Sequence, residues 1–121
     1  MITLVVDDSM AMRRIQAKAL EGMGFQVSTA GNGNEALAVL GALNGCDLIL
    51  TDWHMPEMEG IDLVRAVRKE ARWAKIRIVM VTSQSDTKAV SEALDAGADD
   101  FLMKPFTAET LTARIAEVMR G

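Results

Sequence analysis

The sequence predicts an α/β fold with five parallel strands in one doubly wound sheet and five helices packed on its two faces. Five short apolar segments alternate along the chain with five segments in which apolar residues recur at helical spacing. Three of the apolar segments are almost continuous in Val, Ile, Leu and Met, which is typical of strands that helices cover on both sides. The 121 residues, half of them hydrophobic, suffice for one sizeable core. We therefore expect one domain over residues 1–121.

The predicted strands differ in their place in the sheet. The first, third and fourth are the nearly continuous apolar segments and fit its centre. The second alternates between apolar and polar residues, as an edge strand does, and the fifth is short. In chain order the predicted strands are Ile2–Val6, Phe25–Thr29, Asp47–Leu50, Ile76–Val81 and Asp100–Met103.

A helix with an apolar stripe is predicted after each strand. The residues expected to face the sheet are Met12, Ile15, Ala19 and Met23 in the first helix, Ala36, Leu37 and Leu40 in the second, Ile61, Val64 and Val67 in the third, Val90, Ala93 and Leu94 in the fourth, and Leu111, Ile115, Val118 and Met119 in the fifth. Glycines should end the first helix, at Gly22 or Gly24, and the fourth, at Gly97. Thr107 is expected to cap the start of the fifth helix through its hydroxyl.

Right-handed crossovers between parallel strands leave few ways to connect five such units. The flavodoxin-like strand order 2-1-3-4-5 is the commonest for five units, and it is known from such sheets rather than deduced from these residues. In folds of this class, ligands bind beyond the carboxyl ends of the strands. The residues that follow the strands are therefore the candidates for a functional site.

Polar side chains stand at the carboxyl ends of four predicted strands. They are Asp7 and Asp8 after the first, Asp52 after the third, Thr82 and Ser83 at the end of the fourth, and Lys104 followed by Pro105 after the fifth. Because parallel strands end at one edge of a sheet, we expect these side chains to converge. Any one of them alone would be interpreted as a solvated loop residue, whereas the whole set indicates a site.

Three carboxylates at one edge repel one another. Two charges ~4 Å apart cost about 4 kcal/mol at an effective dielectric constant near 20, so a proton or a cation has to neutralise the group. Carboxylate oxygens with an open, hydrated side favour Mg²⁺. A divalent ion beside an aspartate and a lysine in turn indicates phosphoryl transfer.

The composition limits the environment and the partners. A net charge of −4, interpreted as that of a chain without a Lys/Arg cluster, argues against nucleic-acid binding, because neutralisation of phosphates dominates that affinity. Cys46 is the only cysteine, so an intramolecular disulfide is impossible, and we interpret it as a small buried residue. No apolar run is long enough to cross a bilayer, and no targeting peptide opens the chain. We therefore expect a cytoplasmic protein that binds neither nucleic acid nor membrane.

Four segments resemble the response-regulator receiver domain, and they occur in that family's order and spacing. They are VVDDS (Val5–Ser9), LTDWHMPEMEG (Leu50–Gly60), VTS (Val81–Ser83) and FLMKPF (Phe101–Phe106). The likeness extends over essentially the whole chain. It is greatest to single-domain chemotaxis regulators of the CheY type, because a tryptophan follows the central aspartate and KPFT follows the last strand.

This resemblance assigns roles to the acidic residues. It implies that Asp52 attacks a phosphohistidine on a sensor histidine kinase and becomes an aspartyl phosphate. Asp8 and Asp52 would bind Mg²⁺ directly, together with the main-chain carbonyl of His54. Asp7 would hold a metal-bound water.

The resemblance also implies a switch. Lys104 would pair with the phosphoryl oxygens, and Thr82 would donate a hydrogen bond to the phosphoryl group. Phe101 would move inward as Thr82 is drawn to the phosphate, and the Lys104–Pro105 peptide bond would be cis.

Two side chains depart from the pattern usual in chemotaxis regulators. His54 stands two residues after Asp52, where Asn is more usual, and Gln84 stands two after Thr82, where an acid is common. Both should flank the path of hydrolytic water and so set the lifetime of the phosphoryl group. We expect the His54 side chain on the rim of the site, with a metal-binding or acid–base imidazole as the alternative. Trp53 is expected to be partly exposed on the same loop.

The resemblance implies a monomeric signalling switch that acts without being an enzyme in the usual sense, although it promotes its own phosphorylation and dephosphorylation. The switched surface would comprise the fourth helix, fifth strand and fifth helix, and its target would be a protein such as a flagellar motor switch, with a phosphatase as a further partner. A phosphorelay intermediate and the receiver part of a longer regulator are alternatives.

An aspartyl-phosphate hydrolase is disfavoured, because His54 occupies the position of that class's second aspartate. A flavin carrier is disfavoured because Asp7 and Asp8 would repel its phosphate.

Overall fold

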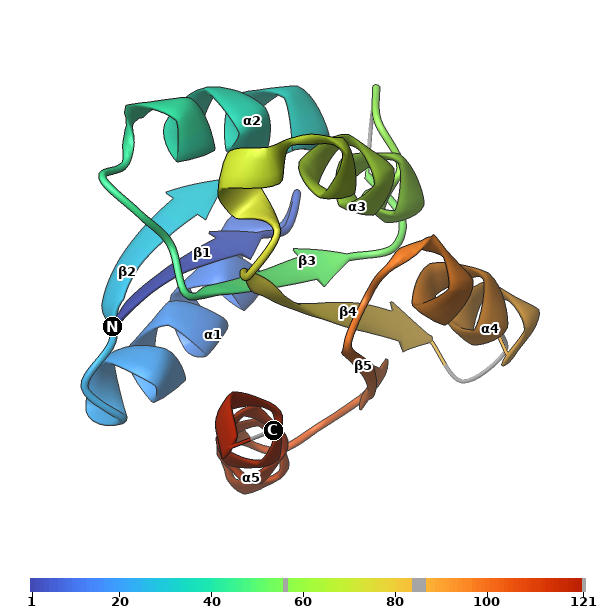
Figure 1. The fold of residues 1–121 in the computed structure, drawn as a ribbon. Helices are drawn as coiled ribbons and strands as arrows, with labels where there is room; N and C mark the ends of the chain where they lie inside the picture. The colour runs from blue at the N-terminus through green and yellow to red at the C-terminus, as the bar shows by residue number, and fades with distance from the viewer. Residues whose placement is uncertain (56, 84–86, 121) are drawn as a thin grey trace.

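The computed structural model describes residues 1–55, 57–83 and 87–120. Figure 1 shows a twisted sheet of parallel strands with helices on both sides. The elements in chain order are β1 (Ile2–Val6), α1 (Met10–Gly22), β2 (Gln26–Ala30), α2 (Gly33–Ala42), β3 (Leu48–Asp52), α3 (Gly60–Lys69), the short 3₁₀ helix η1 (Ala71–Trp73), β4 (Arg77–Ser83), α4 (Thr87–Ala96), β5 (Asp100–Lys104) and α5 (Ala108–Arg120). The strand order is β2-β1-β3-β4-β5, which confirms the predicted topology and the place of the second strand at an edge.

Alternate residues of the strands contribute to two separate cores. Val5 and Leu50 pack with side chains of α1 and α5 on one face of the sheet. Leu4 and Ile49, their neighbours along the same strands, pack with α2 and α3 on the other face. The period of two in a strand therefore explains why the central strands are apolar throughout.

The face of α1 that is directed at the sheet differs from the predicted one. Its buried residues are Gln16 and Leu20, while Ile15 is 54% exposed and Met23 also faces solvent. Gln16 can occupy a buried position because its Nε2 donates a hydrogen bond to Asp7 Oδ2 at 3.3 Å. The stripe prediction was therefore wrong for Ile15 and Met23, which leaves two apolar side chains exposed at α1. It was also wrong for Leu94 of α4, which is 42% exposed.

The predicted helix ends are confirmed. Gly24 and Gly97 follow α1 and α4 with φ values of 96° and 121°, a conformation that glycine adopts without steric cost. Thr107 Oγ1 accepts a hydrogen bond from the Thr110 main-chain N–H at 3.1 Å, so it caps α5.

Four strands, β2 to β5, extend one or two residues further toward their carboxyl ends than the sequence predicts, while β1 ends at Val6 as predicted. Asp52, Thr82 and Lys104 are consequently residues of β3, β4 and β5 themselves. Asp52 lies opposite Val81 in the sheet, and Ser83 lies opposite Lys104. Ladder hydrogen bonds thus hold the main chain of these polar residues more firmly than a loop would. Within the ranges described, the helices are all too short or too polar to span a membrane.

Candidate functional site

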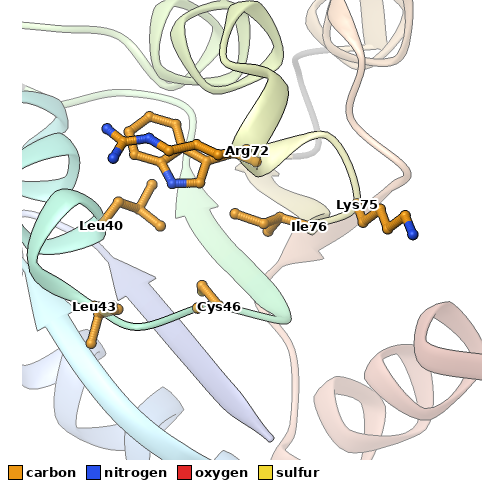
Figure 2. Close-up of a pocket in the computed structure, with 8 residues that line it drawn as sticks. Leu40, Leu43, Cys46, Arg72, Lys75 and Ile76 are labelled. Atoms are coloured by element: carbon orange, nitrogen blue, oxygen red, sulfur yellow. The ribbon is translucent and has the colours of Figure 1, made fainter.

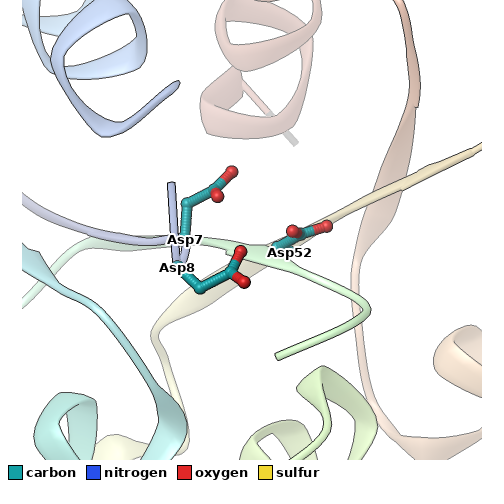
Figure 3. A group of neighbouring side chains, drawn as sticks. All are labelled: Asp7, Asp8 and Asp52. Carbon is teal, nitrogen blue, oxygen red and sulfur yellow. The ribbon is translucent and has the colours of Figure 1, made fainter. Parts of the chain in front are cut away.

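Three aspartates lie together at the carboxyl edge of the sheet (Figure 3). Asp7 and Asp8 follow β1, and Asp52 ends the adjacent strand β3. One carboxylate oxygen of each lies within 4.8 Å of the others. Asp7 and Asp52 are only 1% and 8% exposed, whereas Asp8 faces solvent. The expected convergence of these three residues is therefore confirmed.

Lys104 joins the acidic group from the far side of β4. Its Nζ lies 3.3 Å from Asp52 Oδ2 and 3.7 Å from Asp7 Oδ2. Because Lys104 ends β5, two strands away from β3, its side chain has to reach over β4. The Lys104–Pro105 peptide bond is cis. One lysine thus pairs with two of the three carboxylates and leaves an excess of negative charge.

The environment of Asp52 opposes its ionisation. Burial raises the pKa of Asp52 above its ordinary value, Lys104 lowers it, and the charge of Asp7 raises it further. The main-chain N–H of Trp53 donates to Asp52 Oδ1 at 2.9 Å. The main chain therefore fixes one oxygen of Asp52, and the other faces the lysine.

Asp7 and Asp8 differ in how much of each carboxylate is already engaged. Asp7 Oδ1 accepts a hydrogen bond from the Ser9 N–H at 2.9 Å, and Oδ2 accepts one from Gln16 Nε2 at 3.3 Å. In the described parts of the chain, no residue donates a hydrogen bond to the Asp8 carboxylate. Asp8 thus has both oxygens open to solvent. Sequence reasoning missed Gln16, since a polar residue on a helix gives no signal that it will be buried.

The loop after β3 is shaped by a close main-chain contact. Gly60 N–H donates to the Trp53 carbonyl at 2.8 Å, and a Cβ at residue 60 would overlap the carbonyl oxygen of Asp52. Any other residue would therefore displace Asp52. Glu57, in the same loop, has a φ of 71°, which is unusual for a residue with a side chain.

The expectation that Trp53 is partly exposed is wrong. Its side chain is 9% exposed and packs in the core on the α2 and α3 face of the sheet. The hydrogen bond between Gly60 and Trp53 closes the loop, and burial of so large an aromatic surface outweighs the hydration of its single N–H group.

His54 lies at the rim of the site, as expected. Its side chain is 66% exposed, and its Nδ1 lies 3.3 Å from Glu59 Oε2. The imidazole also meets the Trp53 ring edge-on, with 6.2 Å between ring centres. Gln84, the other residue expected to affect the phosphoryl lifetime, lies outside the described residues.

The two residues of the expected switch lie on neighbouring strands. Thr82 is buried in β4, and Phe101 is half-buried in β5, opposite Met80. The guanidinium carbon of Arg114, from α5, lies 5.8 Å from the centre of the Phe101 ring. An inward movement of Phe101 would therefore change a contact with α5.

The sequence matches response regulator receiver domains over residues 3–116. The chain belongs to this family. It is similar to the chemotaxis protein CheY1 of Helicobacter pylori, with 41% identity over 117 residues, 96% of this chain and 94% of that protein. Chemotaxis protein CheY of Pseudomonas aeruginosa is 40% identical over 116 residues, 95% of this chain and 93% of the relative. The solved structure of the chemotaxis response regulator CheY4 of Vibrio cholerae has a TM-score of 0.90 and 35% identity, and the match covers 97% of both chains.

The acidic group of this receiver domain fits a divalent cation. Its donors are carboxylate oxygens, which Mg²⁺ prefers, and one of the three carboxylates is open to hydrated solvent. The excess negative charge left by Lys104 favours the binding of a further cation. The arrangement therefore combines a buried carboxylate, a lysine and a candidate Mg²⁺ site at one edge of the sheet.

Proposed function

We propose that Asp52 accepts a phosphoryl group from the phosphohistidine of a sensor histidine kinase, and that the modified protein signals through the surface of α4, β5 and α5. The position of Asp52 carries this proposal. It lies at the end of a buried strand, 3.3 Å from Lys104, and within 4.8 Å of two further carboxylates. The receiver domain so defined comprises residues 1–121.

In the transfer, a carboxylate oxygen of Asp52 bonds to phosphorus as the bond from phosphorus to the donor imidazole breaks, and the imidazole nitrogen regains a proton from solvent. Lys104 offsets the charge on the phosphoryl oxygens. Asp8, Asp52 and the His54 carbonyl would hold a Mg²⁺ ion, which would supply positive charge to the phosphoryl oxygens. Asp7 would accept a hydrogen bond from a water of that ion. Because the pKa of Asp52 is raised, the nucleophile is lost to protonation at a higher pH than for an exposed aspartate.

The surface beside Lys104 is suited to docking of the phosphodonor. A hollow of about 420 Å³ is lined by Met12, Ile15, Lys104, Pro105 and Phe106. Its walls are mostly apolar, and it adjoins the lysine that touches Asp52. This hollow supports contact with an apolar helix face of a kinase domain that presents its phosphohistidine to the acidic edge.

Phosphorylation of Asp52 then changes the conformations of two side chains, one on β4 and one on β5. Thr82 turns its hydroxyl toward the phosphoryl group, and the space it vacates admits Phe101. The Arg114 guanidinium, which packs near Phe101, responds to this movement at the surface of α5. Lys104 couples the two events, since it lies on β5 and contacts Asp52 directly.

The relatives, which are chemotaxis proteins, support chemotaxis as the process. The target proposed for the switched surface is a protein such as a flagellar motor switch. The aspartyl phosphate is removed by autodephosphorylation or by a phosphatase. The protein acts in the cytoplasm as a monomer and does not turn over a separate small-molecule substrate. Relay of the phosphoryl group to another protein is the alternative output.

Phosphorylation by acetyl phosphate in the presence of Mg²⁺, followed by intact-mass measurement, tests the proposal. The wild type should gain one phosphoryl group and Asp52→Asn should gain none, while Asp62→Asn, an exposed control, should behave as the wild type. Asp8→Asn should weaken Mg²⁺ binding more than Asp7→Asn does, because Asp8 is the open ligand. A phosphoryl group of similar stability on Asp52→Asn would show that another residue is the acceptor.

A further inference from the structure

A basic segment, residues 65–77, stands out against the acidic character of the chain. It comprises six of the 13 Lys and Arg residues, which are Arg65, Arg68, Lys69, Arg72, Lys75 and Arg77, and one acid, Glu70. Its net charge is therefore +5, in a protein whose net charge is −4. The function proposed for Asp52 makes no use of this charge.

The basic segment lies near the amino-terminal ends of the strands, whereas Asp52 lies at their carboxyl ends. The basic segment runs from the end of α3 through η1 to Arg77, the first residue of β4, whereas Asp52 lies beside the carboxyl-terminal part of that strand. A strand rises about 3.3 Å per residue, so Arg77 and Val81, the residue opposite Asp52, are roughly 13 Å apart along β4. A molecule bound at the basic segment would thus leave the phosphorylation site accessible.

A small hollow opens beside this segment (Figure 2). Its volume is about 220 Å³, and Leu40, Leu43, Trp73 and Ile76 supply most of its apolar wall. Cys46, which is half-buried and not fully buried as predicted, lies between them, and its thiol donates to the Leu48 carbonyl at 3.2 Å. Burial raises the pKa of the Cys46 thiol, so this group is a neutral part of the wall rather than a reactive thiolate.

Two cations lie at the margin of the hollow. The guanidinium carbon of Arg72 lies 4.5 Å over the ring of Trp73, and Lys75 extends away from Ile76 (Figure 2). In the described part of the chain, Lys69, Lys75 and Arg77 form no ion pair. Arg68, by contrast, is held by Asp99 at 3.0 Å. Arg72 Nε lies 3.6 Å from Glu70 Oε2. This ion pair is exposed and contributes little, so the guanidinium can also face the carboxylate of a partner. The positive charge at the margin that the described residues do not neutralise is therefore that of Lys75.

We propose that this hollow and its basic margin dock an acidic segment of a partner protein, which inserts one aliphatic or aromatic side chain against Leu40 and Ile76 and pairs its carboxylates with Arg72 and Lys75. Pockets for small molecules usually measure about 300–1,000 Å³. The hollow is smaller than that and suits the single anchoring side chain found at protein interfaces. The charges steer the partner and select acidic sequences.

The concave shape distinguishes this partner from other polyanions. A lipid surface is bound by apolar side chains that protrude into it, whereas here the apolar residues line a depression. A nucleic acid requires a longer row of cations to neutralise its phosphates. Because the docking surface is remote from Asp52, we expect the partner to remain bound in both phosphorylation states, as a tether would.

The test uses a synthetic acetylated peptide in which two leucines are flanked on each side by three acidic residues. Added to the ¹⁵N-labelled protein, it should shift amide resonances of residues 40–47 and 69–77 and leave those of residues 7–9 unchanged. The double variant Arg72→Glu with Lys75→Glu should weaken binding at least tenfold. The matched control, Arg14→Glu with Lys18→Glu, makes the same charge change on α1 and should bind as the wild type does.

Three further measurements test the proposal in case the double variant Arg72→Glu with Lys75→Glu fails to fold. A peptide with both leucines replaced by serine should bind at least fivefold more weakly, because the hollow then receives no anchor. Asp52→Asn should bind the leucine peptide with unchanged affinity. Anionic phosphatidylglycerol vesicles and a 20-nucleotide single strand should bind more weakly than the peptide. No shifts at 5 mM peptide, equal binding of the serine peptide, or stronger binding of vesicles or oligonucleotide at residues 69–77 would each overturn the proposal.

Discussion

Replacement of Asp52 by asparagine should stabilise the metal-free protein at neutral pH. Asparagine keeps the shape of the side chain and an oxygen that can accept the Trp53 N–H bond. It removes a buried negative charge from the group formed with Asp7 and Asp8. The same change abolishes phosphorylation under the function proposed above. A gain in stability together with a loss of function is the expected result for a charge that is retained for chemistry.

The magnitude follows from the distances. At an effective dielectric constant near 20, the Lys104 contact at 3.3 Å contributes about 5 kcal/mol of attraction. Asp7, within 4.8 Å, contributes about 3.5 kcal/mol of repulsion, and solvent-screened Asp8 about 1 kcal/mol. The attraction and the repulsion nearly cancel. The unfavourable desolvation of the Asp52 carboxylate therefore decides whether its replacement raises or lowers the free energy of unfolding. We expect the free energy of unfolding to rise by about 1–2 kcal/mol, which corresponds to roughly 4–8 °C in Tm for a chain of this length.

Urea denaturation of both proteins in EDTA, from pH 7.5 down to pH 4, tests this reasoning. The folded wild type binds a proton on Asp52 at a higher pH than the unfolded chain does. As the pH falls through the raised pKa of Asp52, the wild type therefore gains stability relative to the variant. The difference in the free energy of unfolding between the two proteins should vanish as the pH approaches 3.8, the ordinary pKa of an aspartate. Asp62→Asn, at an exposed site, should show no such convergence. A variant that is less stable than the wild type at pH 7.5 would refute the argument, because the lysine attraction would then outweigh repulsion and burial together.

Three other changes have definite expected outcomes. Glu57→Gly should raise the free energy of unfolding by about 0.5–1 kcal/mol, because it relieves the positive φ of 71°, whereas Glu59→Gly, at a φ of −65°, should lower it; equal effects in urea denaturation would contradict this. Arg68→Ala should lower stability by about 2–4 kcal/mol, since it leaves the Gly97 carbonyl without its side-chain donor and the Asp99 carboxylate without its ion pair, with the Ile78 N–H still donating to Asp99, while Arg65→Ala, in an exposed ion pair, should cost less than about 0.5 kcal/mol. His54→Asn should shorten the lifetime of the aspartyl phosphate several-fold by admitting water past a smaller side chain, and an unchanged autodephosphorylation rate at saturating Mg²⁺ would exclude shielding by the imidazole.

Much of the site could be predicted because its residues are placed by strand ends. The three aspartates and Lys104 each stand where an apolar run stops, and parallel strands bring their ends to one edge whatever the details of packing. The prediction that the chain has no Lys/Arg cluster was wrong, because the net charge of the whole chain conceals the basic segment, although its six cations can be found in the sequence. Its meaning depends on the hollow beside it, which forms between Leu40 of α2 and Ile76 just before β4, residues far apart in the sequence.

By itself, the sequence determined the alternation of strands and helices, the caps at Gly24, Gly97 and Thr107, and the acidic residues at the strand ends, because local periodicity and main-chain conformation govern these features. The tertiary structure alone decided which side of α1 is buried and where the Trp53 ring lies. Both depend on partners distant in the chain or on loop closure. Gln16 is buried because Asp7 accepts its hydrogen bond, and Trp53 is buried because Gly60 closes the loop around it. The pattern of apolar residues predicts a buried face for each element. Where the fold supplies a polar partner, as Asp7 does for Gln16, a different face can be buried.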